Sequence, residues 1–153
     1  MTTKVITIDT QILEKNEIAA SENRELFKKH KVLAINLLSS PGSGKTALLV
    51  NTCSVLKEKI NVSVTVGDLQ TEADALRIAR AGVPVVQINT GTACHLDAHM
   101  VQQSLKSLPL AQTDILFIEN VGNLVCPATF DVGEHLKVVL LSVAEGEEKP
   151  LKY

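Results

Sequence analysis

Aromatic residues, cysteines and long apolar runs are all scarce in this chain of 153 residues. Phe, Trp and Tyr together make up 3% of the sequence and Trp is absent, so the core has to be built from Val, Ile, Leu and Ala. That mixture is typical of a parallel sheet buried on both faces. No stretch approaches the ~20 apolar residues of a membrane-spanning helix, and the first thirty residues lack the apolar centre of a signal peptide. We therefore expect a cytoplasmic protein without a membrane partner.

An excess of charge of either sign is also missing. Fifteen basic and seventeen acidic side chains leave a formal charge of -2, which gives no broad positive field for a polynucleotide. Nucleic-acid partners are therefore not expected. The three cysteines are too few, and odd in number, for a disulfide framework, so we expect free thiols or metal ligands.

Apolar runs that alternate with helical stretches predict an α/β fold. Strands separated by helices of about 10 to 15 residues imply right-handed crossovers and a mostly parallel sheet flanked by helices. Ahead of the first strand, residues 11–31 have a helix-forming composition and one apolar side, which predicts one or two helices. We therefore divide the chain into an N-terminal helical segment, 1–31, packed on an α/β domain, 32–153. The predicted strands are 32–39, 62–67, 84–89, 114–119 and 137–143, and the predicted helices are 45–59, 71–81 and 95–108.

The stretch SSPGSGKT follows the first predicted strand and opens the next helix. Gly42 and Gly44 let the backbone fold tightly, so that successive N–H groups converge on an anion at the helix start. Lys45 would place a positive charge on the β- and γ-phosphates, and Thr46 a hydroxyl on Mg²⁺. Ser39 stands where the general pattern has its first glycine, and we expect it to matter little because the later positions approach the phosphates. An ordinary strand-to-helix turn is the alternative, but the flanking strand and helix favour a nucleotide site. The predicted phosphate-binding residues are Pro41, Gly42, Ser43, Gly44, Lys45 and Thr46.

A magnesium-nucleotide site also needs carboxylates at the carboxyl ends of the strands. Glu119 ends the strand in ILFIENVG, with Gly122 three residues later, which resembles an E-x-x-G variant of the D-x-x-G switch of GTPases. We expect Glu119 to hold a Mg²⁺-bound water and the Gly122 N–H to sense the γ-phosphate. Asp68 and Asp74 follow another strand; Asp68 is a second Mg²⁺ candidate, and the alternatives are a helix cap and a solvated helix face, respectively. The predicted catalytic set is Lys45, Asp68 and Glu119, and the predicted Mg²⁺ set is Thr46, Asp68 and Glu119.

Two segments that follow strand ends carry cysteine and histidine. NTGTACHLDAHM contributes Cys94 and His95, and ENVGNLVCPATF contributes Cys126, at the edge of the sheet that holds the phosphate loop. Two thiolates and an imidazole suit Zn²⁺ or Ni²⁺, with a fourth position left for water or a partner's ligand. Buried structural cysteines are the alternative, since the chain has no C-x-x-C pair. His99 could extend the site, although an exposed histidine is the simpler interpretation, and Cys53 is expected in the core.

Three stretches together resemble the HypB family of hydrogenase nickel-incorporation GTPases, from about residue 12 to the last residue. They are SSPGSGKT, GDLQTEADALRIARAGVPVVQINTGTACHLDAHMV and ILFIENVGNLVCPATFDVGEHLKVVLLSVAEGEEKPLKY, and within them GTACHLD and ENVGNLVCP are narrow to that family. The resemblance implies a SIMIBI-class P-loop GTPase, with the three-layer α/β fold of P-loop NTPases, that forms a nucleotide-dependent homodimer. It also implies Ni²⁺ or Zn²⁺ at the dimer interface, and nickel delivery to the [NiFe]-hydrogenase large-subunit precursor with a HypA-type partner. By position, Cys94, His95 and Cys126 match the family's metal ligands, and Lys45 and Thr46 match its phosphate and Mg²⁺ residues.

Two departures from the family pattern bear on these expectations. No cysteine precedes residue 53, so the N-terminal cysteine motif of some members is missing, as is any His-rich tract. The chain also stops at EKPLKY, where members continue into a strand with the guanine-reading N-K-x-D motif, so we expect an incomplete G domain that lacks its C-terminal strands and helices. GTP therefore follows from the resemblance, and the sequence alone permits ATP equally. We expect the chain to be less stable than a complete member and to hydrolyse GTP poorly or not at all.

Three alternatives to a nickel-incorporation GTPase fit parts of the sequence. A non-hydrolysing metal-binding or dimerisation module would fit the missing C-terminal part. A urease-type nickel GTPase is disfavoured because its metal motif is a Cys-Pro-His tripeptide, whereas Cys94-His95 and Cys126-Pro127 are separate in this sequence. A P-loop kinase would need lid arginines, and the only arginines are Arg24, Arg77 and Arg80.

Overall fold

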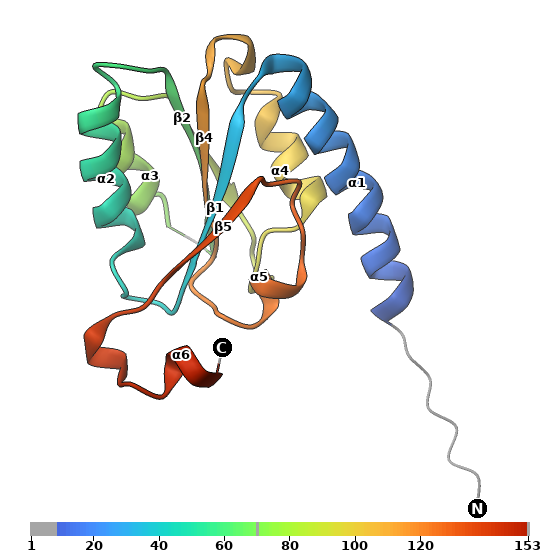
Figure 1. The fold of residues 1–153 in the computed structure, drawn as a ribbon, viewed down its shortest axis with the longest axis vertical. Coiled ribbons are helices and arrows are strands. Elements are labelled where there is room, and N and C mark those ends of the chain that lie inside the picture. Colours follow the sequence, from blue (N-terminus) through green and yellow to red (C-terminus); the bar gives the residue numbers. More distant parts are fainter. Residues whose placement is uncertain (1–8, 70, 153) are drawn as a thin grey trace, which may run out of the picture.

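A five-stranded sheet forms the centre of the structure, a computed structural model that describes residues 9–69 and 71–152 (Figure 1). The strand order is β3-β2-β4-β1-β5, and every neighbouring pair is parallel. The predicted parallel sheet is therefore confirmed, with each strand end within a few residues of its expected place. The strands are β1 (Leu33–Ser39), β2 (Val62–Asp68), β3 (Val85–Asn89), β4 (Ile115–Glu119) and β5 (Leu136–Leu140).

Helices cover both faces of the sheet, which gives three layers. In Figure 1, α2 and α3 lie against one face, and α1 and α4 against the other. Two apolar clusters fill the two interfaces, one containing Phe27 of α1 and Val101 of α4, the other containing Leu49 of α2 and Ile78 of α3. The helices are α1 (Asp9–His30), α2 (Lys45–Leu56), α3 (Ala73–Ala79), α4 (Ala98–Leu105), α5 (Cys126–Thr129) and α6 (Lys149–Lys152), with 3-10 turns η1 (Leu110–Gln112) and η2 (Val143–Glu145).

Burial of the strands follows their place in the sheet. Six of the seven residues of β2 are buried, as expected for an apolar strand covered on both faces. By contrast, four of the five residues of β5 are exposed, because β5 is an edge strand. None of the helices in 9–69 and 71–152 combines the length and the apolar character needed to cross a membrane.

The predicted helices are all present, but α2, α3 and α4 are each shorter than expected. The leading segment is one helix, α1, which ends where Lys31 takes a left-handed backbone conformation with φ of 59°. Helix α4 begins at Ala98 and not at residue 95, because the Asp97 carboxylate caps it by accepting a hydrogen bond from the Met100 N–H at 2.7 Å. Cys94 and His95 therefore lie in the loop before α4, where their side chains are free of helical geometry.

Candidate functional site

A cavity of about 440 Å³ opens at the ends of β1, β2 and β4. Its walls are the phosphate loop, the end of β2 and the segment that follows β4. Parallel strands bring their carboxyl ends to one edge of a sheet, so residues far apart in sequence meet there. The structure thereby brings together the sequence-predicted residues Pro41, Gly42, Ser43, Gly44, Lys45, Thr46, Asp68, Asp74, Glu119 and Gly122.

The backbone of the phosphate loop has the conformation that its glycines permit. Gly42 and Gly44 have φ angles of 75° and 96°, in the left-handed region that side chains other than glycine rarely adopt. A Cβ atom at either position would meet no atom within 4 Å. Glycine is required here for backbone conformation and for the open space above the loop, as expected of an anion cradle.

The ammonium of Lys45 is held by the hydroxyl of Ser39. Lys45 is 8% exposed, and its Nζ donates a hydrogen bond to the Ser39 Oγ at 2.8 Å. Burial lowers the pKa of Lys45, and the nearby charge of Glu119 opposes that shift. The expectation that Ser39 matters little for approach to the phosphates stays a prediction, but this fully buried hydroxyl has a further role, because it holds the lysine head. The signal was the serine itself, at the position where the general motif has glycine.

Thr46 and Glu119 meet at the floor of the cavity. The Thr46 Oγ1 donates to one Glu119 oxygen at 2.7 Å, while the other oxygen, Oε2, is buried without a hydrogen-bond partner among the described residues. Burial raises the pKa of Glu119, although the Thr46 hydrogen bond and the Lys45 charge act in the opposite direction. An orphaned carboxylate oxygen beside a threonine hydroxyl suits a hard cation such as Mg²⁺.

Asp68 lines the cavity but is occupied by its own turn. One carboxylate oxygen accepts from the Leu69 N–H at 2.7 Å, and the other accepts from the Thr71 N–H at 3.2 Å and the Thr71 hydroxyl at 2.6 Å. Helix α3 is preceded by Glu72, so Asp68 is not its N-cap. Asp74 is on that helix, 3.4 Å from a guanidinium nitrogen of Arg77.

Gly122 lies directly against the phosphate loop. A Cβ atom at Gly122 would be 3.0 Å from both the Cα and the Cγ of Pro41, which is tighter than ordinary contact. The segment after β4 therefore touches the loop and would be displaced by even one methyl group.

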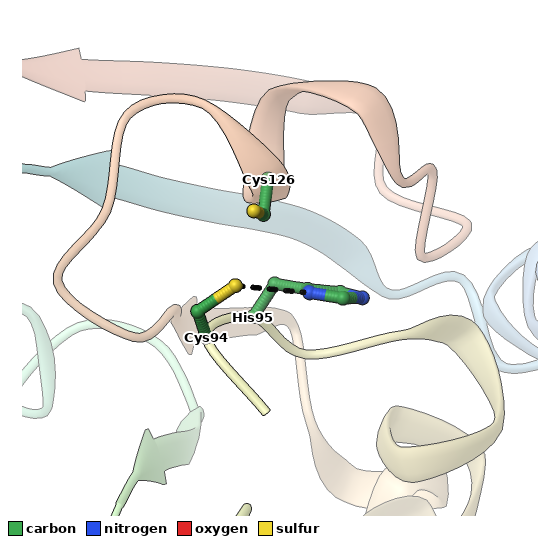
Figure 2. Close-up of side chains that lie close together, drawn as sticks. All are labelled: Cys94, His95 and Cys126. Carbon is green, nitrogen blue, oxygen red and sulfur yellow. Dashed lines mark hydrogen bonds between the residues drawn. The ribbon is translucent and has the colours of Figure 1, made fainter. Parts of the chain in front are cut away.

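Cys94, His95 and Cys126 gather at the same edge of the sheet (Figure 2). One ligand atom from each residue can be chosen so that all three lie within 4.8 Å of one another. Cys94 and His95 come from the loop before α4, and Cys126 begins α5. His99 lies on α4 with its Nε2 3.4 Å from the Gln103 Nε2, and it is outside this group of ligand atoms in the described part of the chain.

The surroundings of this cluster set its proton affinities. Cys94 is exposed, and its contact with the Cys126 side chain raises the pKa of the Cys94 thiol. Burial lowers the pKa of His95, whose ring stacks on Phe130 with centroids 4.0 Å apart. A neutral imidazole and two adjoining sulfurs form a donor set that fits Zn²⁺ or Ni²⁺. Cys53 is fully buried in the core, as expected.

Two asparagines link the segment after β4 to the loop that carries Cys94 and His95. The Asn120 Oδ1 accepts from the Leu96 N–H at 2.9 Å, and the Asn123 Nδ2 donates to the Cys94 carbonyl at 3.4 Å. Sequence reasoning missed both, because an asparagine within ENVGNLVCP does not indicate which distant backbone group its amide contacts.

The turn after β5 braces the outside of the phosphate loop. The Ser43 hydroxyl donates to the Glu145 carboxylate at 2.8 Å, and the Lys149 Nζ donates to the Ser40 Oγ at 3.0 Å. Glu145 also completes a capping box with Ser142. That S-x-x-E pattern was the signal that could have drawn attention to Glu145.

Comparison with known proteins gives the family. The model described as "CobW/HypB/UreG, nucleotide-binding domain" matches residues 33–143. The curated hydrogenase maturation factor HypB of Rhizobium leguminosarum bv. viciae is 55% identical over 150 residues, which are 98% of this chain and 50% of that protein. HypB of Escherichia coli (strain K12) is 53% identical over 150 residues, which are 98% of this chain and 52% of that protein. The chain thus spans about half the length of the curated relatives it matches.

Solved structures agree with this assignment. The crystal structure of HypB from Helicobacter pylori in complex with nickel has a TM-score of 0.86 and 46% sequence identity, over 91% of this chain and 66% of that one. HypB from Archaeoglobus fulgidus has a TM-score of 0.84 and 40% identity, over 92% of this chain and 68% of that one. The expected P-loop GTPase fold is thereby confirmed, and the chain belongs to the CobW/HypB/UreG family, with HypB hydrogenase maturation factors as its relatives.

Proposed function

We propose that this chain is the nucleotide-binding part of a HypB-type GTPase and nickel metallochaperone that serves [NiFe]-hydrogenase maturation. One observation carries the proposal: the ligand atoms of Cys94, His95 and Cys126 converge within 4.8 Å at the sheet edge that also holds the phosphate loop. The nickel complex of the Helicobacter pylori relative supports the choice of cargo. A protein that only hydrolysed nucleotide would have no need of paired thiols beside its switch.

The phosphate loop would bind GTP together with Mg²⁺. The loop N–H groups receive the phosphates, Lys45 exchanges its Ser39 partner for a phosphate oxygen, and Thr46 and Glu119 hold the cation. Asp68 is proposed as a further Mg²⁺-linked residue once its turn rearranges. Bound Mg²⁺ supplies neutralisation of phosphate charge, and the protein supplies the orientation of the groups around it.

Cys94, His95 and Cys126 would hold the Ni²⁺ or Zn²⁺ cargo. Three donors leave a fourth position open, which suits a carrier that must release its ion. Cys94 is exposed, and Val125, which directly precedes Cys126, is 56% exposed, so this face is available to a second copy of the chain, and we propose the homodimer there. A HypA-type partner, the hydrogenase large-subunit precursor and a cytoplasmic location complete the proposal.

Nucleotide state would control metal binding through the segment from Glu119 to Cys126. Glu119 contacts Thr46, Gly122 packs on Pro41, and the same short segment ends in the ligand Cys126. Movement of the segment when the γ-phosphate is lost therefore displaces a thiolate. Local rearrangements of this kind are the usual output of nucleotide switches.

Equilibrium binding tests the proposal. GTP, GDP and ATP are titrated with and without Ni²⁺, and the mass of the oligomer is measured in each state. We expect GTP-dependent dimerisation, and a nickel affinity that differs between the GTP- and GDP-bound forms. Cys126→Ala should remove the nickel site, and Cys53→Ala, in the core, should leave it unchanged. Metal binding without nucleotide binding would favour the non-hydrolysing module, and unchanged nickel stoichiometry in Cys126→Ala in both nucleotide states would contradict the coupling.

A further inference from the structure

Helix α1 carries two buried asparagines on the side that faces the segments bearing Cys94, His95 and Cys126. Asn16 is 8% exposed and Asn23 is fully buried. A buried amide is costly unless it is hydrogen-bonded. Their partners therefore indicate what α1 is built to hold.

Asn16 joins the two segments that bear the candidate metal ligands. Its Oδ1 accepts from the Ala98 N–H at 2.9 Å, and its Nδ2 donates to the Asp131 carbonyl at 2.7 Å. Ala98 begins α4, directly after the loop that holds Cys94 and His95. Asp131 lies just beyond α5, whose first residue is Cys126. One side chain thus fixes the backbone of both segments.

Asn23, further along α1, connects the helix to the same two segments. Its Nδ2 donates to the Ala98 carbonyl at 2.8 Å and to the Val132 carbonyl at 3.0 Å. Its Oδ1 remains buried without a partner among the described residues. The two donations are kept although the unpaired oxygen costs free energy. We therefore interpret the Asn23 hydrogen bonds as a constraint on the two segments.

The chain also approaches α1 closely at this point. A Cβ atom at Gly133 would lie 2.7 Å from the Ala20 carbonyl oxygen, so only glycine fits there. An Arg24 guanidinium nitrogen lies 2.6 Å from the Asp131 carboxylate and adds a contact at the surface. The segment 131–133 is therefore held to α1 by its backbone and by a side chain.

Phe130 connects these contacts to the candidate metal ligands. Phe130 immediately precedes Asp131, and its ring stacks on His95 at 4.0 Å between centroids. Fixing Asp131 to Ala98 therefore fixes Phe130 against His95 and sets the separation of His95 from Cys126. We propose that α1 is a clamp for the metal site and that Asn16 is its positioning residue, an inference that rests on the proposed metal binding at Cys94, His95 and Cys126.

Metal titration of Asn16→Ala tests the clamp. Removing a group that hydrogen-bonds to a metal ligand and orients it typically weakens metal affinity about 10- to 100-fold. Because Asn16 acts through backbone and not on a ligand, we expect the low end, about a tenfold weaker affinity for Ni²⁺, with an altered nickel–thiolate absorption spectrum. Asn51→Ala, at an exposed position on α2, is the matched control and should change neither. Unfolding measured in the presence of a chelator establishes that the variants compared are folded.

The outcomes separate the clamp from the metal site itself. Unchanged nickel affinity and spectrum in folded Asn16→Ala would overturn the clamp and leave the metal site standing. Should Asn16→Ala not fold, Arg24→Ala carries the test from a half-buried position, with an expected loss of about threefold and with unchanged affinity as the contradicting result. A chain with its natural residues that binds neither Ni²⁺ nor Zn²⁺ would overturn the proposed metal site and the clamp with it.

Discussion

The Thr46 hydroxyl donates a hydrogen bond of 2.7 Å to Glu119 and so joins the start of α2, which follows β1, to the neighbouring strand β4. Thr46 is the second residue of α2, and Glu119 is the last residue of β4. The remaining Glu119 oxygen is buried and has no partner in the described part of the chain. A carboxylate that is only half satisfied in the nucleotide-free protein is prepared to accept a cation.

Glu119→Gln should therefore remove the magnesium dependence of nucleotide binding. The amide keeps the shape of the side chain and can still accept from Thr46, but it lacks the charge that Mg²⁺ requires. Since a hydrogen bond or contact to a charged group is worth about 1.5–3 kcal/mol, we expect affinity for Mg·GTP to fall roughly 10- to 100-fold. Affinity measured in EDTA should change little. GTP titrations with and without Mg²⁺ test this prediction. An equal loss of affinity under both conditions would show that Glu119 acts on the nucleotide and not on the cation.

Ser39→Ala should destabilise the nucleotide-free chain. It removes the acceptor that the buried Lys45 ammonium uses at 2.8 Å, at a cost of about 1.5–3 kcal/mol in the free energy of unfolding. Nucleotide affinity should hold or improve, because Lys45 no longer gives up a partner to reach a phosphate. Denaturant unfolding and nucleotide titration measure the two effects, with Ser54→Ala at an exposed position of α2 as the control. Weaker nucleotide binding with unchanged stability would contradict this role for Ser39.

The fold could be predicted because its determinants are local. Runs such as VSVTV and ILFI contain few polar residues, which indicates strands buried on both faces, and the helices predicted between the first four strands indicate parallel pairing. The phosphate loop was predictable for the same reason, since its function depends on glycines and a lysine at fixed spacing. The start of α4 was not, because Asp97 competes with the apolar pattern and moves the helix start past His95.

The supporting contacts of the site could not be predicted in this way. Asn16 and its partner Asp131 are 115 positions apart, and Ser43 and Glu145 are 102 apart, so only the folded chain brings each pair together. Neither asparagine nor serine signals a long-range partner by its type. Sequence patterns predict which groups touch ligands, while the groups that hold those residues in place required the structure.

Gly122→Ala should weaken GTP binding more than GDP binding. Its new methyl group would lie 3.0 Å from the Pro41 Cα, so the phosphate loop or the segment after β4 has to shift, at a cost of about 1–3 kcal/mol. We expect GTP affinity to fall about tenfold and GDP affinity less, since the Gly122 N–H is predicted to face the γ-phosphate. An equal loss for GTP and GDP would contradict γ-phosphate sensing.

Glu145→Gln should remove an acid-sensitive brace from the phosphate loop. Hydrogen bonds from the Ser40 side chain and the Ser142 N–H are the largest of several contacts that lower the pKa of Glu145 to about 2. The ordinary value in an unfolded chain is about 4.3. Between these values the folded chain binds fewer protons at this site, so its contribution to stability is complete above pH about 4.3 and is lost as the pH falls toward 2. The difference in unfolding free energy between the natural chain and Glu145→Gln should therefore be constant from pH 7 to about 5 and shrink below about pH 4. Urea unfolding across this range measures this difference, with Glu147→Gln, at an exposed position just after η2, as the control. A difference that stays constant down to pH 3 would show that the brace does not depend on the Glu145 charge.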